Sequence, residues 1–165
     1  MIQRCVGKDL VLRPDSAADL DRARNVLRAY ANTLSMPECL GDFDQELLLL
    51  PGDYAQPRGQ LLLAWVDDQA VGCCALRALD NVDYAEACEM RRLYVDPSFR
   101  GLGIGRRLVE AQLDFARITG YRCVLLDTLS DMEAARALYE ELGFEEIPPY
   151  YFNNMAGAHY LKADL

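Results

Sequence analysis

Residues 91–107 read RRLYVDPSFRGLGIGRR, and this stretch governs how the rest of the chain is interpreted. Three glycines alternate with apolar residues at 101–105, directly before a segment, 104–118, whose apolar residues recur every three to four positions. Glycine lets the backbone approach an anion closely, and the start of a helix adds partial positive charge. A bare turn would also use glycines, but it gives no reason to gather arginines that repel one another. We therefore expect this segment to bind phosphate, helped by Arg100, Arg106 and Arg107.

Two common nucleotide-binding motifs do not fit the glycine segment. A P-loop reads G-x-x-x-x-G-K-[ST], and neither the lysine nor the serine or threonine is present here. A dinucleotide fingerprint needs glycine at its sixth position, where this chain has Arg106. It also needs a strand that runs directly into the first glycine, whereas five residues separate Val95 from Gly101. The phosphate must therefore belong to another kind of ligand.

The segments around this stretch predict a mixed α/β domain. Two apolar runs joined by a polar turn at 67–69 predict a hairpin, and a third strand that ends before Pro97 extends it into an antiparallel meander. The helix that follows, and the buried strand after it, imply a parallel crossover. We predict a single domain over residues 1–165, with a mostly antiparallel central sheet of six to seven strands and helices on both faces. Strands are expected at 9–13, 60–66, 70–76, 87–95, 123–126 and 159–161, and helices after Ser16, around 46–50, over 104–118 and after a capping-box pattern, SDME, at 130–133.

The composition excludes several classes of protein. The chain has 165 residues, 52% of them hydrophobic, which suffices for a core without disulfides or metal. Its formal net charge of −9 repels nucleic-acid phosphates, so no nucleic acid is expected as a partner. Positive charge is nevertheless gathered at 91–107, where five arginines stand against one aspartate. No apolar run approaches a membrane span of about 20 residues, and the first residues lack the apolar core of a signal peptide, so we expect no membrane partner and a cytoplasmic location.

The cysteines and the single histidine form no recognisable metal motif. The six cysteines include no C-x-x-C pair, and His159 is distant in sequence from all of them, so no metal is expected. Serine-hydrolase chemistry is also excluded, because His159 is the only imidazole and no G-x-S-x-G elbow exists. Four cysteines lie in apolar or strand-like runs and are expected to be buried free thiols, namely Cys73, Cys74, Cys88 and Cys123.

The quoted stretch resembles motif A of the GNAT N-acetyltransferase superfamily, whose pattern ends in R/Q-x-x-G-x-G/A. Arg100, Gly103 and Gly105 stand at its fixed positions, and residues 137–144, ALYEELGF, resemble the family's later L-Y-x-x-x-G-F helix. The resemblance covers residues 60–144 well and the N-terminal helices only loosely. One departure is Met132, which stands where the family often has an asparagine that touches the cofactor, so that contact is missing or is supplied by a neighbour such as Ser130.

The resemblance implies acetyl-coenzyme A as cosubstrate, bound where the fourth and fifth strands, parallel neighbours, splay apart. It implies that backbone groups of Leu93, Tyr94 and Val95 pair with the pantetheine amides, while a main-chain N–H near Val95 stabilises the oxyanion. Direct transfer to an amine is implied, and dimers are common in the superfamily. The residues implied to hold the pyrophosphate are Arg100, Gly101, Leu102, Gly103, Ile104, Gly105 and Arg106.

Transfer to an amine requires a base and an acid, because the amine is mostly protonated at neutral pH and the leaving thiolate must be reprotonated. The resemblance implies Tyr139 as the acid; the alternative is a core tyrosine on an amphipathic helix. For the base we choose Glu89, which lies on the strand that enters motif A and would act through a water molecule. The alternative, equally weighted, is a glutamate paired with Arg91 or Arg77, which share a charged strand face with it.

The acceptor is less constrained by the sequence. Arg77, Arg91 and Arg92 are candidates for holding an acceptor carboxylate, since guanidinium binds carboxylates in bidentate fashion; a solvated charged strand face is the alternative. Tyr150, in the loop from 147 to 157, is a candidate pocket wall. These features favour acetylation of a small-molecule amine, for example an amino acid. Two alternatives stay open: a non-catalytic coenzyme A-binding sensor or subunit, and an enzyme that acetylates protein N-termini or lysines.

Overall fold

The computed structural model describes residues 10–35, 37–151 and 156–165. Its strands form one sheet in the order β1-β2-β3-β4-β5-β7-β6, in which β4 and β5 are parallel and the other neighbours are antiparallel. The predicted mixed, mostly antiparallel sheet is therefore confirmed. The strands are β1 (Leu10–Leu12), β2 (Gln60–Val66), β3 (Gln69–Leu79), β4 (Ala87–Val95), β5 (Cys123–Leu129), β6 (Glu145–Ile147) and β7 (Ala158–Asp164).

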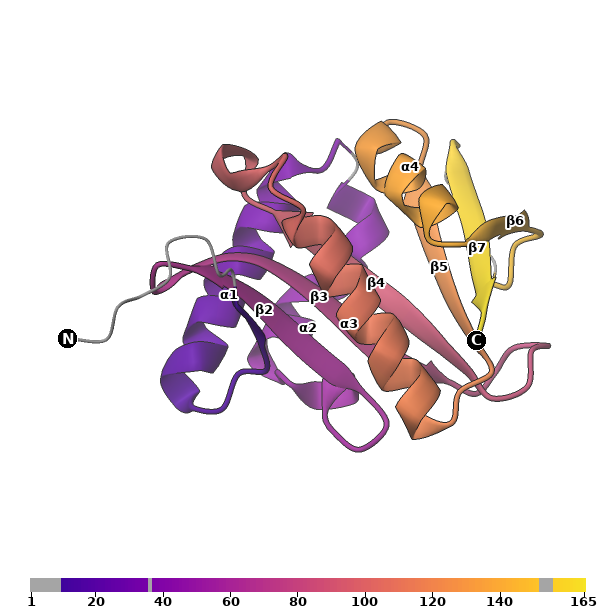
Figure 1. The fold of residues 1–165 in the computed structure, drawn as a ribbon, viewed down its shortest axis with the longest axis horizontal. Coiled ribbons are helices and arrows are strands. Elements are labelled where there is room, and N and C mark those ends of the chain that lie inside the picture. Colours follow the sequence, from indigo (N-terminus) through magenta and orange to yellow (C-terminus); the bar gives the residue numbers. More distant parts are fainter. Residues whose placement is uncertain (1–9, 36, 152–155) are drawn as a thin grey trace.

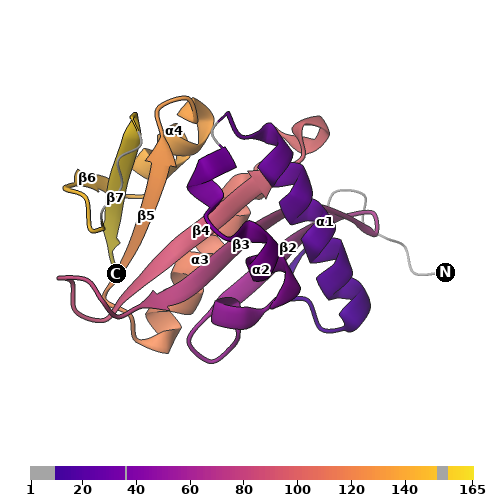
Figure 2. The same ribbon diagram turned by 180° about the vertical axis from the view of Figure 1, so that it is seen from behind.

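Helices cover both faces of the sheet, as expected. Figures 1 and 2 show α3 and α4 on one face and α1 and α2 on the other. One core lies between the sheet and α3 with α4 and includes Leu108 and Tyr139, whereas a second core lies under α1 and α2 and includes Leu27 and Leu47. The helices are α1 (Ala17–Thr33), α2 (Phe43–Leu48), α3 (Ile104–Thr119) and α4 (Glu133–Glu141), with 3-10 turns η1 (Pro37–Leu40), η2 (Gly52–Tyr54) and η3 (Pro97–Phe99).

Local sequence patterns explain most helix ends. Ser16 caps α1 by accepting a hydrogen bond from the Asp19 N–H, and α3 begins after Gly103 and ends at Gly120, both in the left-handed conformation. The capping box predicted at 130–133 is wrong: α4 begins after Met132 with no side-chain cap. The Ser130 hydroxyl instead donates to the Gly157 carbonyl at 3.0 Å, because the start of β7 lies beside it.

The parallel strands β4 and β5 separate along their length. They pair over only three positions, from Ala87 with Cys123 to Glu89 with Leu125, although β4 continues to Val95 and β5 to Leu129. A bulge interrupts the other side of β4, where the register with β3 shifts between Cys73 and Ala75. Arg92 lies in this bulge with φ +60. The sheet therefore opens between the two strands, as the resemblance implies.

The cysteine prediction is confirmed, since Cys73, Cys74, Cys88 and Cys123 are buried free thiols. Burial raises the pKa of Cys73 to about 12, so that thiol is uncharged at neutral pH. Within the described residues, no three or more His, Cys, Asp or Glu side chains come together as metal ligands. None of the described helices has the length and apolar character needed to cross a membrane.

Candidate active site

A cleft of about 570 Å³ lies at the opening between β4 and β5. The end of β4 and the glycine turn form one side of it, and the start of α4 forms the other, with the C-terminal end of α1 contributing Tyr30. Two further hollows, of about 360 and 620 Å³, lie beside α1 and are not lined by the glycine turn. The cleft at the opening is lined by the residues predicted to bind the cofactor, apart from Leu102, whereas the predicted acid, Tyr139, and base, Glu89, are not among its lining residues.

The glycine turn has the conformation that its sequence predicts. Gly101 and Gly103 have φ values of +83 and +81, a region that side chains other than glycine rarely adopt. The Arg100 Nε donates to the Val95 carbonyl at 2.9 Å, which ties the turn to the end of β4. Because the first amides of a helix have no partner within it, the N–H groups that follow Gly103 are available to an anion.

The five arginines of the 91–107 stretch do not lie together in the structure. Arg91 and Arg92 both contact Glu46 of α2, on the opposite face of the sheet from α3. Arg92 is 7% exposed and binds Glu46 through two nitrogens, so it is not available to an acceptor carboxylate. Arg106, at the start of α3, hydrogen-bonds Glu141 of α4. Of these five arginines, only Arg100, Arg106 and Arg107 belong to the glycine turn and the start of α3.

The end of β4 contributes a backbone edge to the cleft. Leu93, Tyr94 and Val95 line it, beyond the last position at which β4 pairs with β5. Val95 and Tyr94 pair on their other side with Gly72 and Cys73 of β3, which holds this edge in place. An extended ligand can therefore add to β4 where β5 has moved away.

Glu89 lies at the point where the two strands part and is held by three side chains. The Arg77 Nη2 lies 2.8 Å from Glu89 Oε1, and the Arg91 Nε lies 3.5 Å from the same oxygen. The Tyr150 hydroxyl donates to Glu89 Oε2 at 2.8 Å. The structure thus brings three of the four acceptor-binding candidates, Arg77, Arg91 and Tyr150, to the base candidate, and the two arginines are the ion-pair partners considered for Glu89.

Tyr139 lies on the other face of the sheet, in the core under α3 and α4. Its ring packs against Phe144 with centroids 5.5 Å apart. Burial raises the pKa of Tyr139 well above its ordinary value of 10, and Cys74, Tyr30 and Asp127 raise it further. The phenol is therefore protonated at neutral pH, which is the state that a proton donor needs.

Comparison with known proteins agrees with this geometry. Residues 24–144 match the family described as the Acetyltransferase (GNAT) family. The chain belongs to the GNAT acetyltransferase family. It is 32% identical over 148 residues to an uncharacterized N-acetyltransferase of Schizosaccharomyces pombe, covering 89% of each chain. It is 33% identical over 125 residues to the N-acetylaspartate synthetase of Homo sapiens, covering 76% of this chain but 38% of that longer protein.

Solved GNAT structures share the fold. An acetyltransferase from Streptococcus agalactiae superposes with a TM-score of 0.76 at 21% identity, covering 95% of this chain and 98% of the other. An acetyltransferase from Salmonella typhimurium, solved with its cofactor acetyl-CoA, superposes with a TM-score of 0.72 at 18% identity, covering 94% and 93%. The seven-stranded sheet opened between β4 and β5 is thus the fold of GNAT proteins.

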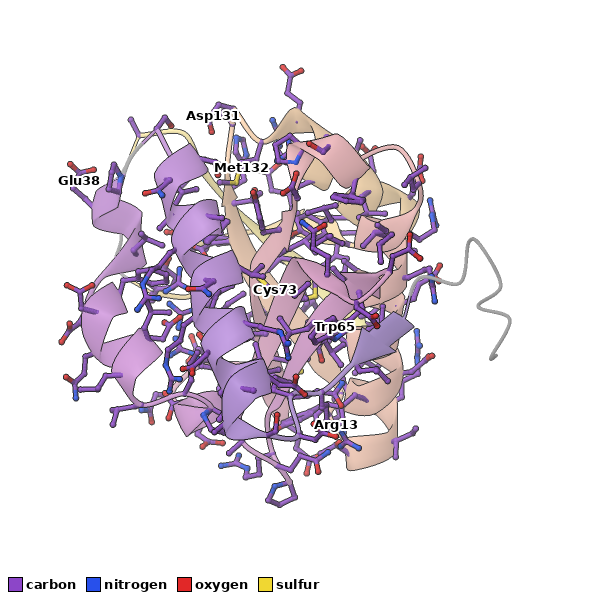
Figure 3. All side chains as sticks on the ribbon, turned by 90° about the vertical axis from the view of Figure 1, so that its left-hand side faces the viewer. Arg13, Glu38, Trp65, Cys73, Asp131 and Met132 are labelled. Carbon is purple, nitrogen blue, oxygen red and sulfur yellow. The ribbon has the colours of Figure 1, made fainter. Side chains whose placement is uncertain are left out.

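Sequence reasoning missed two features of this GNAT site. Asp127 of β5 lies beyond the last β4–β5 pair and accepts a hydrogen bond from the Tyr151 hydroxyl. Its signal was a lone charge inside the apolar run 123–129. Asp131 lies near Met132, and both are labelled in Figure 3. Its carboxylate accepts a hydrogen bond from the Ser35 hydroxyl at 2.6 Å, which joins the end of α1 to the loop before α4. That contact joins segments 96 residues apart, so no local pattern indicates it.

The structure also shows the surroundings of Met132 and Ser130, the two residues considered for the polar cofactor contact. Met132 accepts a hydrogen bond through its sulfur from Thr128 at 3.6 Å, in the position where the family often has asparagine. Ser130, the suggested substitute, has its hydroxyl bonded to the Gly157 carbonyl and 2.8 Å from His159 Nε2. Its oxygen is therefore already engaged by β7. In the loop from 147 to 157, the structure describes all residues except 152–155. This loop contacts Glu89 through the Tyr150 hydroxyl.

Proposed function

We propose that this GNAT protein transfers the acetyl group of acetyl-CoA directly to the amine of a small molecule that bears a carboxylate. The observation behind the proposal is the arrangement around the strand opening. A phosphate-binding turn lies at one end, protonated Tyr139 lies on one face, and the Glu89 cluster with its arginines lies on the other. Bound acetyl-CoA supplies the thioester that is cleaved.

The residues of the cleft fit a coenzyme A molecule. Its diphosphate needs amide donors and positive charge, which the glycine turn, the start of α3 and the arginines at 100–107 supply. Its amides need backbone partners, which the edge of β4 from Leu93 to Val95 supplies. A Cβ at Gly101 or Gly103 would meet nothing within 4 Å, so both glycines border open space.

Arg91 is the arginine best suited to an acceptor carboxylate. Its contacts are long: Nη1 lies 3.2 Å from the Tyr54 hydroxyl and 3.5 Å from Glu46, and Nε lies 3.5 Å from Glu89. A guanidinium can donate five hydrogen bonds, so Arg91 keeps donors for a bidentate carboxylate. The similarity to N-acetylaspartate synthetases supports an acceptor of this class, because aspartate carries carboxylates beside its amine.

The test has two stages. Calorimetry with acetyl-CoA should give saturable binding, and thiol release should then be followed with a panel of amines, including amino acids, their decarboxylated analogues and peptides with free N-termini. Turnover with carboxylate-bearing amines supports the proposal. Absence of coenzyme binding would overturn it, binding without turnover would favour a non-catalytic coenzyme A-binding protein, and turnover with peptides alone would favour a protein acetyltransferase.

A further inference from the structure

Two carboxylates border the opening between β4 and β5 on the same face of the sheet. Glu89 pairs with Leu125 across the parallel strands, and Asp127 follows Leu125 by two residues, so its side chain emerges on that same face. Tyr150 lies near both, because its hydroxyl is bonded to Glu89 and its pKa, raised mainly by burial, is raised further by Glu89 and Asp127. Either carboxylate therefore lies where a proton from an acceptor amine could be taken.

We infer that Asp127, rather than Glu89, is the carboxylate that receives the proton of the acceptor ammonium, an inference that rests on the proposed acetyl transfer to an amine. Glu89 is 3% exposed, and its oxygens are occupied by Arg77, Arg91 and Tyr150. To accept a proton, Glu89 would have to give up charge-assisted hydrogen bonds with Arg77. Its role is to position Arg77, Arg91 and Tyr150 around the acceptor.

Asp127 has the opposite surroundings. Within the described residues it forms no ion pair, and the Tyr151 hydroxyl is its hydrogen-bond donor. The nearby cation on β7 is Lys162, which lies opposite Leu125 in the strand register. Its ammonium is bound to Asp164 at 3.0 Å. Asp127 is half-buried, so its negative charge remains accessible to an ammonium ion. The Asp127 carboxylate can therefore both attract the acceptor ammonium and accept its proton.

The position of Asp127 also relates it to the proposed acid. Asp127 is one of the groups that raise the pKa of Tyr139, after burial, Cys74 and Tyr30, although the two residues are on opposite faces of the sheet. The two side chains are therefore close enough to interact electrostatically across the sheet. A carboxylate on the acceptor side and a phenol on the other side of the opening are the arrangement that transfer of two protons requires.

The acceptor ammonium loses one proton to Asp127, from which it passes to solvent, and the freed nitrogen forms a bond to the acetyl carbon. The bond from that carbon to sulfur breaks, and the thiolate takes a proton from Tyr139. The second proton lost by the nitrogen restores Tyr139 to its phenol form. The products are the N-acetylated acceptor, the coenzyme thiol and one proton in solution.

The kinetic test compares three variants with the wild type. Asp127→Asn should lower kcat/KM at about pH 7 at least a hundredfold, the usual contribution of a general base. Its residual rate should rise about tenfold per pH unit up to about pH 9, because the variant can use only amine that is already deprotonated. Glu89→Gln should raise KM for the acceptor and keep the wild-type pH profile. Arg117→Gln, which removes an arginine that pairs at the surface with Asp114, should stay within about threefold of wild type.

A second measurement does not depend on turnover. Carbon-13 NMR of protein labelled at the aspartate carboxyl should show one signal that is lost in Asp127→Asn, and methylammonium chloride, but not an equal concentration of potassium chloride, should shift it. If methylammonium leaves that signal unchanged, if Asp127→Asn keeps wild-type kcat/KM, or if Glu89→Gln shows the pH profile expected of Asp127→Asn, the assignment of Asp127 is overturned. Failure of the wild type with every amine would instead overturn the proposed function.

Discussion

Arg92 and Glu46 form a buried, two-point ion pair between the bulge of β4 and α2. The Arg92 Nη2 lies 2.9 Å from Glu46 Oε1, and the Arg92 Nε lies 3.0 Å from Glu46 Oε2. The Arg92 Nη2 also donates to the Leu40 carbonyl at 3.3 Å. Because Arg92 adopts a left-handed backbone conformation, the pair holds the bulge that accompanies the separation of β4 from β5.

Glu46→Ala should destabilise the fold by about 3 kcal/mol, because it leaves the Arg92 guanidinium buried without its counter-ion. The side chains of Arg92 and Glu46 are 5% and 16% exposed, so solvent cannot replace the lost partner. Urea unfolding at about pH 7 measures the difference. Asp21→Ala is the control, since its pair with Arg24 is on the surface and should contribute less than about 0.5 kcal/mol. Equal losses in the two variants would contradict this assignment.

The same pair should make stability depend on pH. Burial acts to raise the pKa of Glu46, but the hydrogen bonds and charge of Arg92 outweigh it and hold the pKa below the ordinary value of 4.5. A lowered pKa in the folded state means that the stabilisation is fully present above about pH 4.5 and is lost as the pH falls through the folded value. The difference in unfolding free energy between wild type and Glu46→Gln should therefore shrink at acid pH. A difference independent of pH would refute the argument.

Much of the fold follows from local sequence. The predicted strand at 87–95 coincides with β4, and the predicted helix at 104–118 falls within α3, because Pro97, Gly103 and Gly120 mark their ends. The glycine turn was predicted because its conformation is decided by the glycines themselves. Such features depend on residues that are close in sequence, so they can be predicted without the rest of the structure.

The parts that sequence did not predict depend on distant neighbours. The pattern at 130–133 fits a capping box, but β7 engages the Ser130 hydroxyl through Gly157, and a tertiary contact overrides the local one. The strand β6 is only three residues long and was missed. Arg91 and Arg92 are separated from the arginines at 100–107 because both bind Glu46 of α2, and a bulge in β4 lets Arg92 reach it. Asp127 lies two residues beyond the partner of Glu89 on β5, at the strand opening, and this position depends on the pairing of distant strands.

Alanine at two glycines of the turn should change stability in opposite directions. Gly103 has φ +81, and a side chain in that conformation costs about 1–2 kcal/mol even though space is available. Gly105 is inside α3, and its Cβ would meet Leu138 at 3.6 Å, an ordinary contact, so alanine should stabilise the helix by up to about 1 kcal/mol. Thermal unfolding distinguishes the two. A loss of stability in Gly105→Ala as large as that in Gly103→Ala would show that the backbone conformation is not the cause.

Arg91→Gln should affect recognition of the acceptor more than the chemical step. If Arg91 holds the acceptor carboxylate, KM for a carboxylate-bearing amine should rise about tenfold or more, while KM for the decarboxylated analogue should change little. Steady-state kinetics with the matched pair of amines measures this. The control is Arg117→Gln, an arginine of α3 that pairs at the surface with Asp114. Equal effects on the two amines would assign Arg91 to holding Glu89 and Glu46 in place.

Tyr139→Phe should lower kcat about a hundredfold while leaving stability and the Kd of acetyl-CoA nearly unchanged, because only the proton-donating hydroxyl is removed. The ring that packs on Phe144 stays. Since the folded-state pKa is raised well above 10, the wild-type rate should not fall on account of Tyr139 between about pH 7 and 9. Thiol-release kinetics, calorimetry and thermal unfolding separate these effects, with Tyr84→Phe, outside the cleft, as the control. Retention of half the wild-type kcat would mean that Tyr139 fills the core and that another group reprotonates the thiolate.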